Sequence, residues 1–129
     1  MSNREAISTD GAPAAAGPYS QAVRAGELVF TAGQLGMDPA SGELASNIGG
    51  QAERALRNLE AILIAAGSGL DRLVKVTVYL ADIGDWPAVN EVYAAILPEP
   101  YPARSAFAVK DLPKSALVEI EAVATVGVG

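Results

Sequence analysis

The sequence predicts an α+β domain in which two α-helices lie on one face of a mixed β-sheet. Two segments, 47–66 and 85–97, repeat their apolar residues with the period of a helix. Segments of strand-like composition precede, separate and follow them, so the order is strands, helix, strand, helix, strands. A chain of 129 residues is long enough for one hydrophobic core and too short for two. We therefore expect a single domain over residues 1–129.

The chain before the first helix is expected to hold one broken strand and a turn. The stretch "GAPAAAG" (11–17) is typical of an extended connection. The stretch "ELVFTAGQLGM" (27–37) is typical of a short strand that is interrupted at Gly33. The residues that follow, "DPASGE" (38–43), have the composition of a hairpin-like turn.

The first helix is predicted over residues 47–66. Ser46 or Asn47 is suited to cap its N-terminus, because either side chain can accept a hydrogen bond from a free backbone N–H group. Gly67 is suited to end it. The apolar residues of its buried face are Ile48, Ala52, Ala55, Leu56, Leu59, Ile62, Leu63 and Ala66.

The next strand and helix are predicted from their periodicity. In "LVKVTVYL" (73–80), one face holds Val74, Val76, Val78 and Leu80, and the other holds Leu73, Lys75, Thr77 and Tyr79. The second helix, "DWPAVNEVYAAIL" (85–97), has Asp85 as its cap and tolerates Pro87 in its first turn. Its apolar face is formed by Trp86, Val89, Tyr93, Ile96 and Leu97.

Two strands are predicted after the second helix, at residues 103–109 and 117–128, with "KDLPKS" (110–115) as the turn between them. Prolines at 98, 100 and 102 prevent a helix from reaching the first of these strands. Arg104 therefore lies at the start of a strand whose other residues are mostly small and apolar.

The last strand distinguishes the two faces of the predicted sheet. The row expected beneath the helices is Val118, Ile120, Ala122, Ala124, Val126 and Val128. The opposite row is Leu117, Glu119, Glu121, Val123 and Thr125. Two helices cover only one face, so this second face would expose apolar side chains in a monomer, namely Leu73, Tyr79, Leu117 and Val123. We expect a homo-oligomer with closed cyclic symmetry that buries the second face.

Composition excludes several kinds of active site and partner. The chain has no histidine and no cysteine, so we expect no Ser-His-Asp triad, no thiolate nucleophile, no metal and no cofactor. Nine basic and 15 acidic residues give a net charge of −6, and the basic residues are scattered, so nucleic acid is not an expected partner. No apolar run suits a membrane helix, and the first residues do not resemble a secretory signal. We expect a cytoplasmic protein without membrane association.

Arg104 and Glu119 are the first candidates for chemistry. If the bulky residues of strand 103–109 face the helices, Arg104 and Ala106 lie on the second face with Glu119 and Glu121. A guanidinium among small side chains near a subunit interface can bind a carboxylate through two parallel hydrogen bonds. Two neighbouring carboxylates can raise one pKa into the range of general acid–base catalysis. The alternatives are a structural Arg–Glu ion pair and a solvated acidic face.

Two further features have both a functional and a structural interpretation. Tyr19 follows Gly17-Pro18 in an irregular segment that can fold over a cleft and present its hydroxyl; the alternative is a packed aromatic side chain. The glycines of "TAGQLG" (31–36) are not followed closely enough by a helix to form a phosphate site.

Six stretches, in order and with matching spacing, resemble the RidA (YjgF) family over nearly the whole chain. They are "GPYSQAV" (17–23), "FTAGQLGMDPASGEL" (30–44), "QAERALRNLEAILIAAGSGLDRLVKVTVYLADI" (51–83), "VNEVYAAIL" (89–97), "YPARSAFAV" (101–109) and "LPKSALVEIEAVA" (112–124). The resemblance implies a homotrimer of chorismate-mutase-like α+β subunits with three clefts between neighbours. It also implies hydrolysis of reactive 2-imino acids such as 2-iminobutanoate and 2-iminopropanoate, the tautomer of 2-aminoacrylate, to 2-keto acids and ammonia.

The resemblance also implies roles for individual residues. Arg104 matches the arginine that binds the substrate carboxylate, and Glu119 matches the glutamate that positions the attacking water. Tyr19 and Asn90 match residues of the substrate cleft. Many members carry a serine where this chain has Ala32 and a cysteine where it has Ala106. The first difference removes a hydroxyl contact, while a backbone contact at residue 106 would survive the second.

Other functions remain open at this point. A non-enzymatic protein that binds a keto acid as a signal would use the same arginine. A pathway-specific deaminase for an aminoacrylate-like or aminomuconate-like compound would use the same hydrolytic groups. Endoribonuclease or chaperone activity is a further possibility in this family, and the net charge and the lack of histidine count against an endoribonuclease.

Overall fold

The computed structural model describes residues 3–126, which form a seven-stranded mixed sheet and two α-helices. The sheet order is β1-β2-β3-β7-β5-β6, and β4 pairs with β7 outside this order. The strands are β1 (Arg4–Ile7), β2 (Ala22–Ala25), β3 (Leu28–Thr31), β4 (Gln34–Leu35), β5 (Leu73–Leu80), β6 (Ala103–Ala108) and β7 (Val118–Thr125). The helices are α1 (Ile48–Ala65) and α2 (Trp86–Ile96). β5 and β6 run parallel, and the other pairs run antiparallel.

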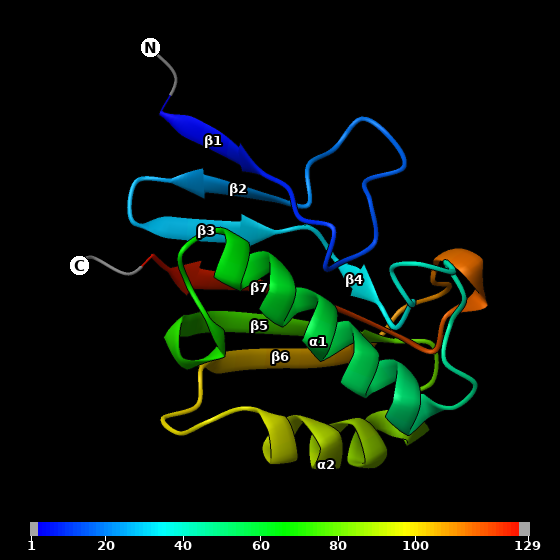
Figure 1. The fold of residues 1–129 in the computed structure, drawn as a ribbon. Coiled ribbons are helices and arrows are strands. Elements are labelled where there is room, and N and C mark those ends of the chain that lie inside the picture. The colour runs from blue at the N-terminus through cyan, green and yellow to red at the C-terminus, as the bar shows by residue number, and fades with distance from the viewer. Residues whose placement is uncertain (1–2, 127–129) are drawn as a thin grey trace.

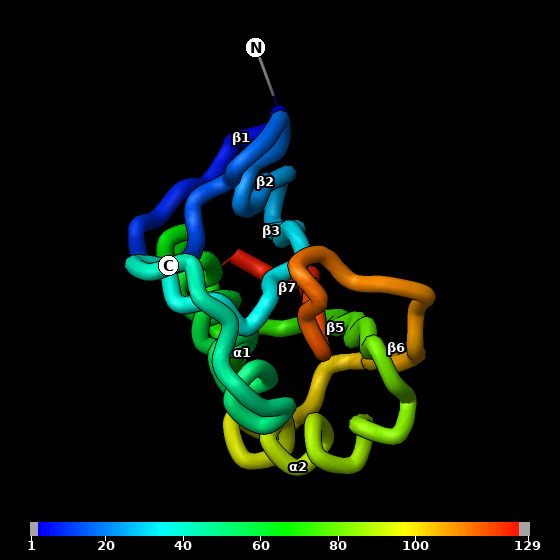
Figure 2. The backbone as a smooth tube through the Cα atoms, turned by 90° about the vertical axis from the view of Figure 1, so that its right-hand side faces the viewer, coloured from blue at the N-terminus to red at the C-terminus, as the bar shows by residue number. Residues whose placement is uncertain are grey.

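Both helices lie on one face of the sheet, as the expected α+β architecture requires (Figure 1). The perpendicular view shows α1 and α2 beside each other, with β5 and β6 next to them (Figure 2). One buried cluster joins both helices to the central strands; its largest members are Leu56, Leu59, Val76, Val78, Leu80, Val89, Tyr93, Val118 and Ile120. No helix within residues 3–126 combines the length and the apolar composition needed to cross a membrane.

Local signals in the sequence place α1 correctly. Asn47 caps its N-terminus by accepting a hydrogen bond from the backbone N–H of Gly50 at 2.8 Å. The chain leaves the helix at Gly67, whose φ of +82° is a conformation that glycine adopts without steric cost. The turn between Met37 and Leu44 is also present, and an isolated bridge pairs these two residues.

The hairpin formed by β1 and β2 was not predicted. β1 lies at the edge of the sheet, and Ile7 is its only buried residue. An edge strand that buries so little carries no alternating apolar pattern, so its sequence does not distinguish it from a loop.

The start of β5 corrects the predicted alternation. Val74 was expected beneath the helices and Leu73 on the opposite face, but Leu73 packs against the buried clusters and Val74 is 45% exposed. The register against β7 shifts between Leu73 and Lys75, so one extra residue is inserted there as a β-bulge. Residues on one side of a bulge lie on the face opposite to the one that simple alternation predicts. Nothing in the sequence marks the position of this bulge.

The N-terminus of α2 also differs from the prediction. Asp85 makes no capping hydrogen bond and has helical backbone angles. Asp82 instead caps a short 3₁₀ turn (Ile83–Asp85) that leads into α2, accepting from the N–H of Gly84 at 2.8 Å. The cap therefore lies three residues earlier than expected, while Pro87 is in the first turn as predicted.

The two faces of β7 are as predicted. Val118, Ile120, Ala122, Ala124 and Val126 are buried beneath the helices, and Val128 lies outside the described residues. The intervening residues are partly exposed on the second face. This face also exposes the rings of Phe30 and Phe107, each at 45%.

Candidate active site

Arg104 is held by three side chains of α2. Its guanidinium lies over the ring of Trp86 at 4.5 Å and over the ring of Tyr93 at 4.8 Å from the respective centroids. Its Nη1 donates a hydrogen bond of 2.8 Å to Oδ1 of Asn90. Asn90 follows Trp86 by four residues and precedes Tyr93 by three, so the three side chains share the face of the helix that meets β6. We call this group the arginine clamp.

The clamp borders a surface hollow of about 360 Å³, called the Arg104 hollow. Its lining residues are Asn90, Tyr93, Ala94, Tyr101, Pro102 and Arg104. A guanidinium has five N–H donors, and the contacts with the rings and with Asn90 leave several of them for a ligand. A planar carboxylate matches two of these donors at once, so the hollow is suited to bind one.

Tyr93 connects this hollow to the core. Its side chain is 2% exposed, and its hydroxyl is buried without a hydrogen-bond partner among the described residues. Burial raises the pKa of Tyr93, and the positive charge of Arg104 partly opposes that rise. Tyr93 is therefore a neutral, rigid surface for the guanidinium at physiological pH.

The structure contradicts the expected orientation of β6. Arg104 pairs with Val76 and Ala106 pairs with Val78, and both valines are buried beneath the helices. Arg104 and Ala106 therefore lie on the helix face rather than on the second face. Ala106 packs against the core there.

The alternate residues of β6 occupy the second face. The ring of Phe107 contacts Tyr79 edge-on at 5.4 Å, and Lys75 Nζ donates to Ser105 Oγ at 3.1 Å. The prediction assumed that bulky apolar side chains face the helices. It was wrong because the second face also carries large apolar side chains.

Glu119 lies on the second face, where it lines a different hollow of about 400 Å³, called the Glu119 hollow. Its neighbours in that wall include Tyr19, Ala32, Gly33, Pro113 and Lys114. The Glu119 side chain packs directly on Gly33, where a Cβ atom would collide with the carboxylate. Gly33 therefore interrupts the strand and also leaves room for the acid.

The carboxyl group of Glu119 has an environment suited to proton transfer. Desolvation raises its pKa, and the neighbouring Glu121 carboxylate adds to the rise. Glu121 also contributes to a raised pKa of Tyr79, for which burial is the larger cause. Glu119 rather than Glu121 lines the hollow, so it is the carboxylate that a ligand can reach.

Tyr19 and Ala32 lie in the same wall as Glu119. Tyr19 is 54% exposed, and its hydroxyl accepts a hydrogen bond of 3.4 Å from the N–H of Ala16. Asn90, in contrast, lies with Arg104. The candidate residues thus divide into two groups that belong to opposite faces of the sheet.

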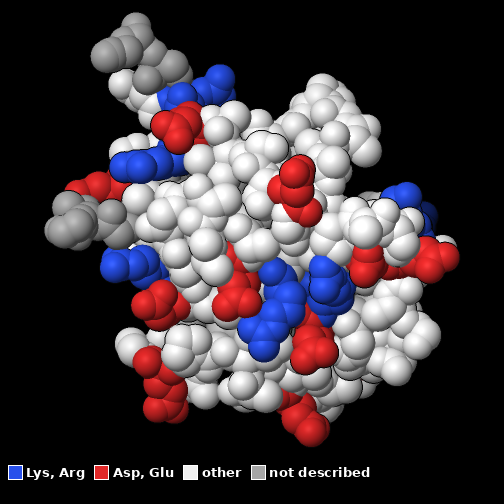
Figure 3. Space-filling view, in the orientation of Figure 1, with Lys and Arg blue, Asp and Glu red and all other residues white. Residues whose placement is uncertain are grey.

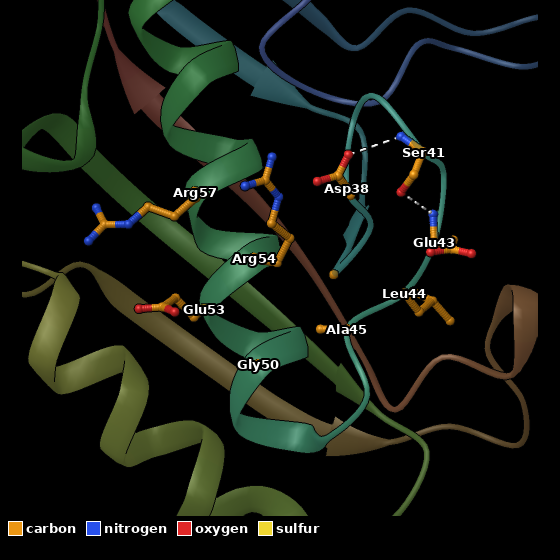
Figure 4. A pocket seen from close by; sticks show the side chains of 10 residues that line it. Asp38, Ser41, Glu43, Leu44, Ala45, Gly50, Glu53, Arg54 and Arg57 are labelled. Carbon is orange, nitrogen blue, oxygen red and sulfur yellow. Dashed lines mark hydrogen bonds between the residues drawn. The ribbon is translucent and has the colours of Figure 1, made fainter.

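A third hollow, of about 670 Å³, is larger than these two and lies between α1 and the turn 38–43 (Figure 4). Three of its charged residues already have partners: Asp38 accepts from the N–H groups of Ala40 and Ser41, Arg57 pairs with Glu60, and Arg54 donates to the Met37 carbonyl. On this side of the molecule, basic and acidic side chains are intermingled (Figure 3). Size alone does not make this hollow the functional site.

Sequence reasoning did not identify the arginine clamp or the packing of Gly33. Trp86 and Tyr93 were assigned to the apolar face of α2, which is correct, but periodicity cannot show that a charged residue of β6 lies against them. Within residues 3–126, no group of three or more potential metal ligands (His, Cys, Asp or Glu) lies close enough together to hold an ion.

Comparison with known proteins gives matches along nearly the whole chain. A family model described as "Endoribonuclease L-PSP" matches residues 9–126. The RutC family protein y4sK of Sinorhizobium fredii is 55% identical over 92% of this chain and 95% of its own. Human 2-iminobutanoate/2-iminopropanoate deaminase is 49% identical over 96% of this chain and 91% of its own. The crystal structure of RidA from the Antarctic bacterium Psychrobacter sp. has a TM-score of 0.92 and 48% identity, covering 95% of this chain and 99% of that one.

The arginine clamp predicts the effect of substitutions at Trp86. Trp86→Leu removes one cation–π contact, which is worth about 0.5–2 kcal/mol, and should weaken binding of a small carboxylate such as 2-oxobutanoate about three- to thirtyfold. Trp86→Phe keeps a ring and should lose less. Isothermal titration calorimetry measures both affinities, and thermal unfolding of each variant reports any loss of stability. A Trp86→Leu protein that is less stable yet binds with unchanged affinity would restrict the clamp to a structural role.

Proposed function

The chain belongs to the Endoribonuclease L-PSP family, which includes the RidA (YjgF) proteins, and on this premise we propose that it hydrolyses reactive 2-imino acids to 2-keto acids and ammonia. The membership confirms the family expected from the sequence. The observation that carries the proposal is the clamped guanidinium of Arg104, which is suited to the carboxylate that every 2-imino acid has. The human relative is named for 2-iminobutanoate and 2-iminopropanoate, and these are the proposed substrates.

The proposed reaction divides between two side chains. Arg104 binds the α-carboxylate and fixes the adjacent carbon of the protonated imine. Glu119 accepts a proton from a water molecule as its oxygen bonds to that carbon, and then returns the proton to the nitrogen. The C–N bond breaks as the proton of the new hydroxyl group passes to Glu119, so ammonia leaves and the 2-keto acid remains; Glu119 then gives that proton to the ammonia or to solvent. The raised pKa of Glu119 supports this role, because a carboxyl group that titrates closer to neutrality transfers protons in both directions more readily.

We further propose that each site is a cleft between two copies of this chain in a homotrimer. Arg104 and Glu119 project from opposite faces of the sheet, so a small substrate cannot touch both within one subunit. The exposed second face supports assembly, because Leu28, Phe30 and Phe107 present apolar surface there. In the cleft, Asn90 and Arg104 of one subunit would face Tyr19, Ala32 and Glu119 of its neighbour. The backbone at Ala106 would follow Arg104 into the same cleft.

The family description does not lead us to propose ribonuclease activity. The net charge of −6 opposes binding to a phosphate backbone. The chain also has no histidine to act as general acid or base. A single clamped guanidinium fits the carboxylate of a small metabolite better than a run of phosphates.

Turnover of freshly generated imines tests the proposed function. Threonine dehydratase produces 2-iminobutanoate in situ, and the release of 2-oxobutanoate and ammonia is followed with and without the protein. Wild type should accelerate the release, while Arg104→Ala should reduce kcat/KM at least a hundredfold because the α-carboxylate loses its partner. Sedimentation confirms that the variant keeps its assembly. Binding of 2-oxobutanoate without any acceleration of imine hydrolysis would identify a ligand-binding protein instead. If the protein neither binds 2-oxobutanoate nor accelerates the hydrolysis, a larger substrate is favoured.

Mixing two inactive variants tests the shared cleft. Arg104→Ala and Glu119→Gln, co-expressed in equal amounts, should form mixed assemblies in which about a quarter of the clefts combine an intact Arg104 with an intact Glu119. Activity should therefore return to about a quarter of the wild-type value. If the two residues act within one subunit, every site lacks one of them and no activity returns.

The two glutamates should differ in rate and in pH dependence. Glu119→Gln should lower kcat about a hundredfold, since it removes the proton acceptor, and Glu121→Gln should lower it less. Wild-type kcat should rise with pH through the raised pKa of Glu119, because only the ionised carboxylate accepts a proton. Glu121→Gln removes a like charge, lowers that pKa and should shift the rise to lower pH. A greater loss in Glu121→Gln, measured across a pH series, would show that Glu121 is the catalytic group.

A further inference from the structure

Lys114 occupies an unusual backbone conformation in the wall of the Glu119 hollow. Its φ and ψ of 57° and 24° fall in the left-handed region, and the next residue, Ser115, has a φ of 56°. Glycine and asparagine adopt this region readily, whereas lysine does so at an energetic cost. Strained residues of this kind concentrate at functional sites, where the surrounding structure holds them in place.

The turn that carries Lys114 is fixed on both sides. Pro113 restricts the backbone before it, and the N–H of Ala116 donates to the Pro113 carbonyl at 3.0 Å. Ala116 is 1% exposed, and the N–H of Leu117 donates to the side chain of Gln51 on α1 at 2.9 Å. The position of the Lys114 backbone is therefore set by the core rather than by the solvent.

The ammonium of Lys114 is not the counter-ion of Glu119. The pKa of Glu119 is raised by desolvation and by Glu121, whereas a cation close to it would lower that pKa. No ion pair of Lys114 occurs within residues 3–126. Lys114 is the only basic residue in the wall of this hollow, and Glu119 is the only acidic one. Lys114 thus contributes a positive charge to this wall without forming an ion pair with Glu119 among the described residues.

We propose that Lys114 binds a second anionic group of the substrate, so that the site accepts dicarboxylic 2-imino acids of the 2-iminosuccinate and 2-iminoglutarate class. This inference rests on the proposed function, in which Arg104 of the neighbouring subunit binds the α-carboxylate. The hollow of about 400 Å³ offers more room than a three-carbon imino acid fills. An ammonium supplies three donors and attracts a carboxylate without requiring one fixed orientation, which suits the flexible end of such a substrate.

The test compares two substrate classes in wild type and in three variants. Aspartate oxidase with catalase generates 2-iminosuccinate, threonine dehydratase generates 2-iminobutanoate, and ammonia release beyond spontaneous hydrolysis gives kcat/KM for each. Lys114→Asn removes the charge and tolerates the left-handed backbone, while Lys114→Arg keeps the charge. The matched control is Lys110→Asn, which changes an exposed lysine that does not line the hollow.

Wild type and Lys110→Asn should accelerate hydrolysis of both substrates. Lys114→Asn should lower the ratio of kcat/KM for 2-iminosuccinate to that for 2-iminobutanoate about tenfold, the usual value of one charge-assisted hydrogen bond, and Lys114→Arg should largely restore it. An unchanged ratio in Lys114→Asn, or a wild type that accelerates only 2-iminobutanoate, overturns the inference and leaves the proposed function intact. A wild type that accelerates neither substrate overturns both.

Discussion

The alternation of side chains along β-strands is the constraint on which the candidate site depends. β5 lies between β6 and β7, and its buried row sets the face of each neighbour. Because Val76 faces the helices, Arg104 must also do so, and because Tyr79 faces away, Glu119 must as well. One strand therefore separates the two residues that are best suited to chemistry. The proposed site, which uses both of them, therefore lies between two copies of the chain.

Buried amide side chains hold the segments around the Glu119 hollow. Asn58 of α1 donates to the carbonyls of Leu35 and Met37, and Gln51 joins the carbonyl of Ala45 to the N–H of Leu117. Gln21 holds the N-terminal segment in the same way: its side chain accepts a hydrogen bond from the N–H of Thr9 and donates one to the carbonyl of Thr9. Loops cannot bury their own backbone groups cheaply, so these amides substitute for the missing strand partners. Rigid loops are what keep Tyr19 and Lys114 in one wall with Glu119.

The two charged groups are held in opposite ways. The rings of Trp86 and Tyr93 immobilise the guanidinium of Arg104 without neutralising its charge. Glu119 has no cationic partner within residues 3–126; burial and a neighbouring carboxylate make its charged form costly. A fixed cation serves to bind, and a carboxylate with a raised pKa serves to move protons. This division is consistent with hydrolysis that uses no nucleophile of the protein itself.

Much of the fold followed from local patterns in the sequence. The apolar period of α1, the cap at Asn47, the stop at Gly67 and the alternation along β7 each depend on residues close together in the chain, so they could be predicted. Of the candidate site, Arg104, Glu119 and Tyr19 were found from their chemical type and their place in the chain, and the roles of Asn90, Ala32 and Ala106 came from the family resemblance.

Only the tertiary structure decided which face each of these residues occupies. The orientation of β6, the bulge beside Val74 and the rings that hold Arg104 all depend on contacts between distant segments. A strand with apolar residues on both faces carries no internal sign of which face the helices cover. The sequence therefore determined which side chains are available for chemistry, and the packing of α2 and β5 against β6 determined that Arg104 and Glu119 lie apart, because register is set by pairing and not by composition.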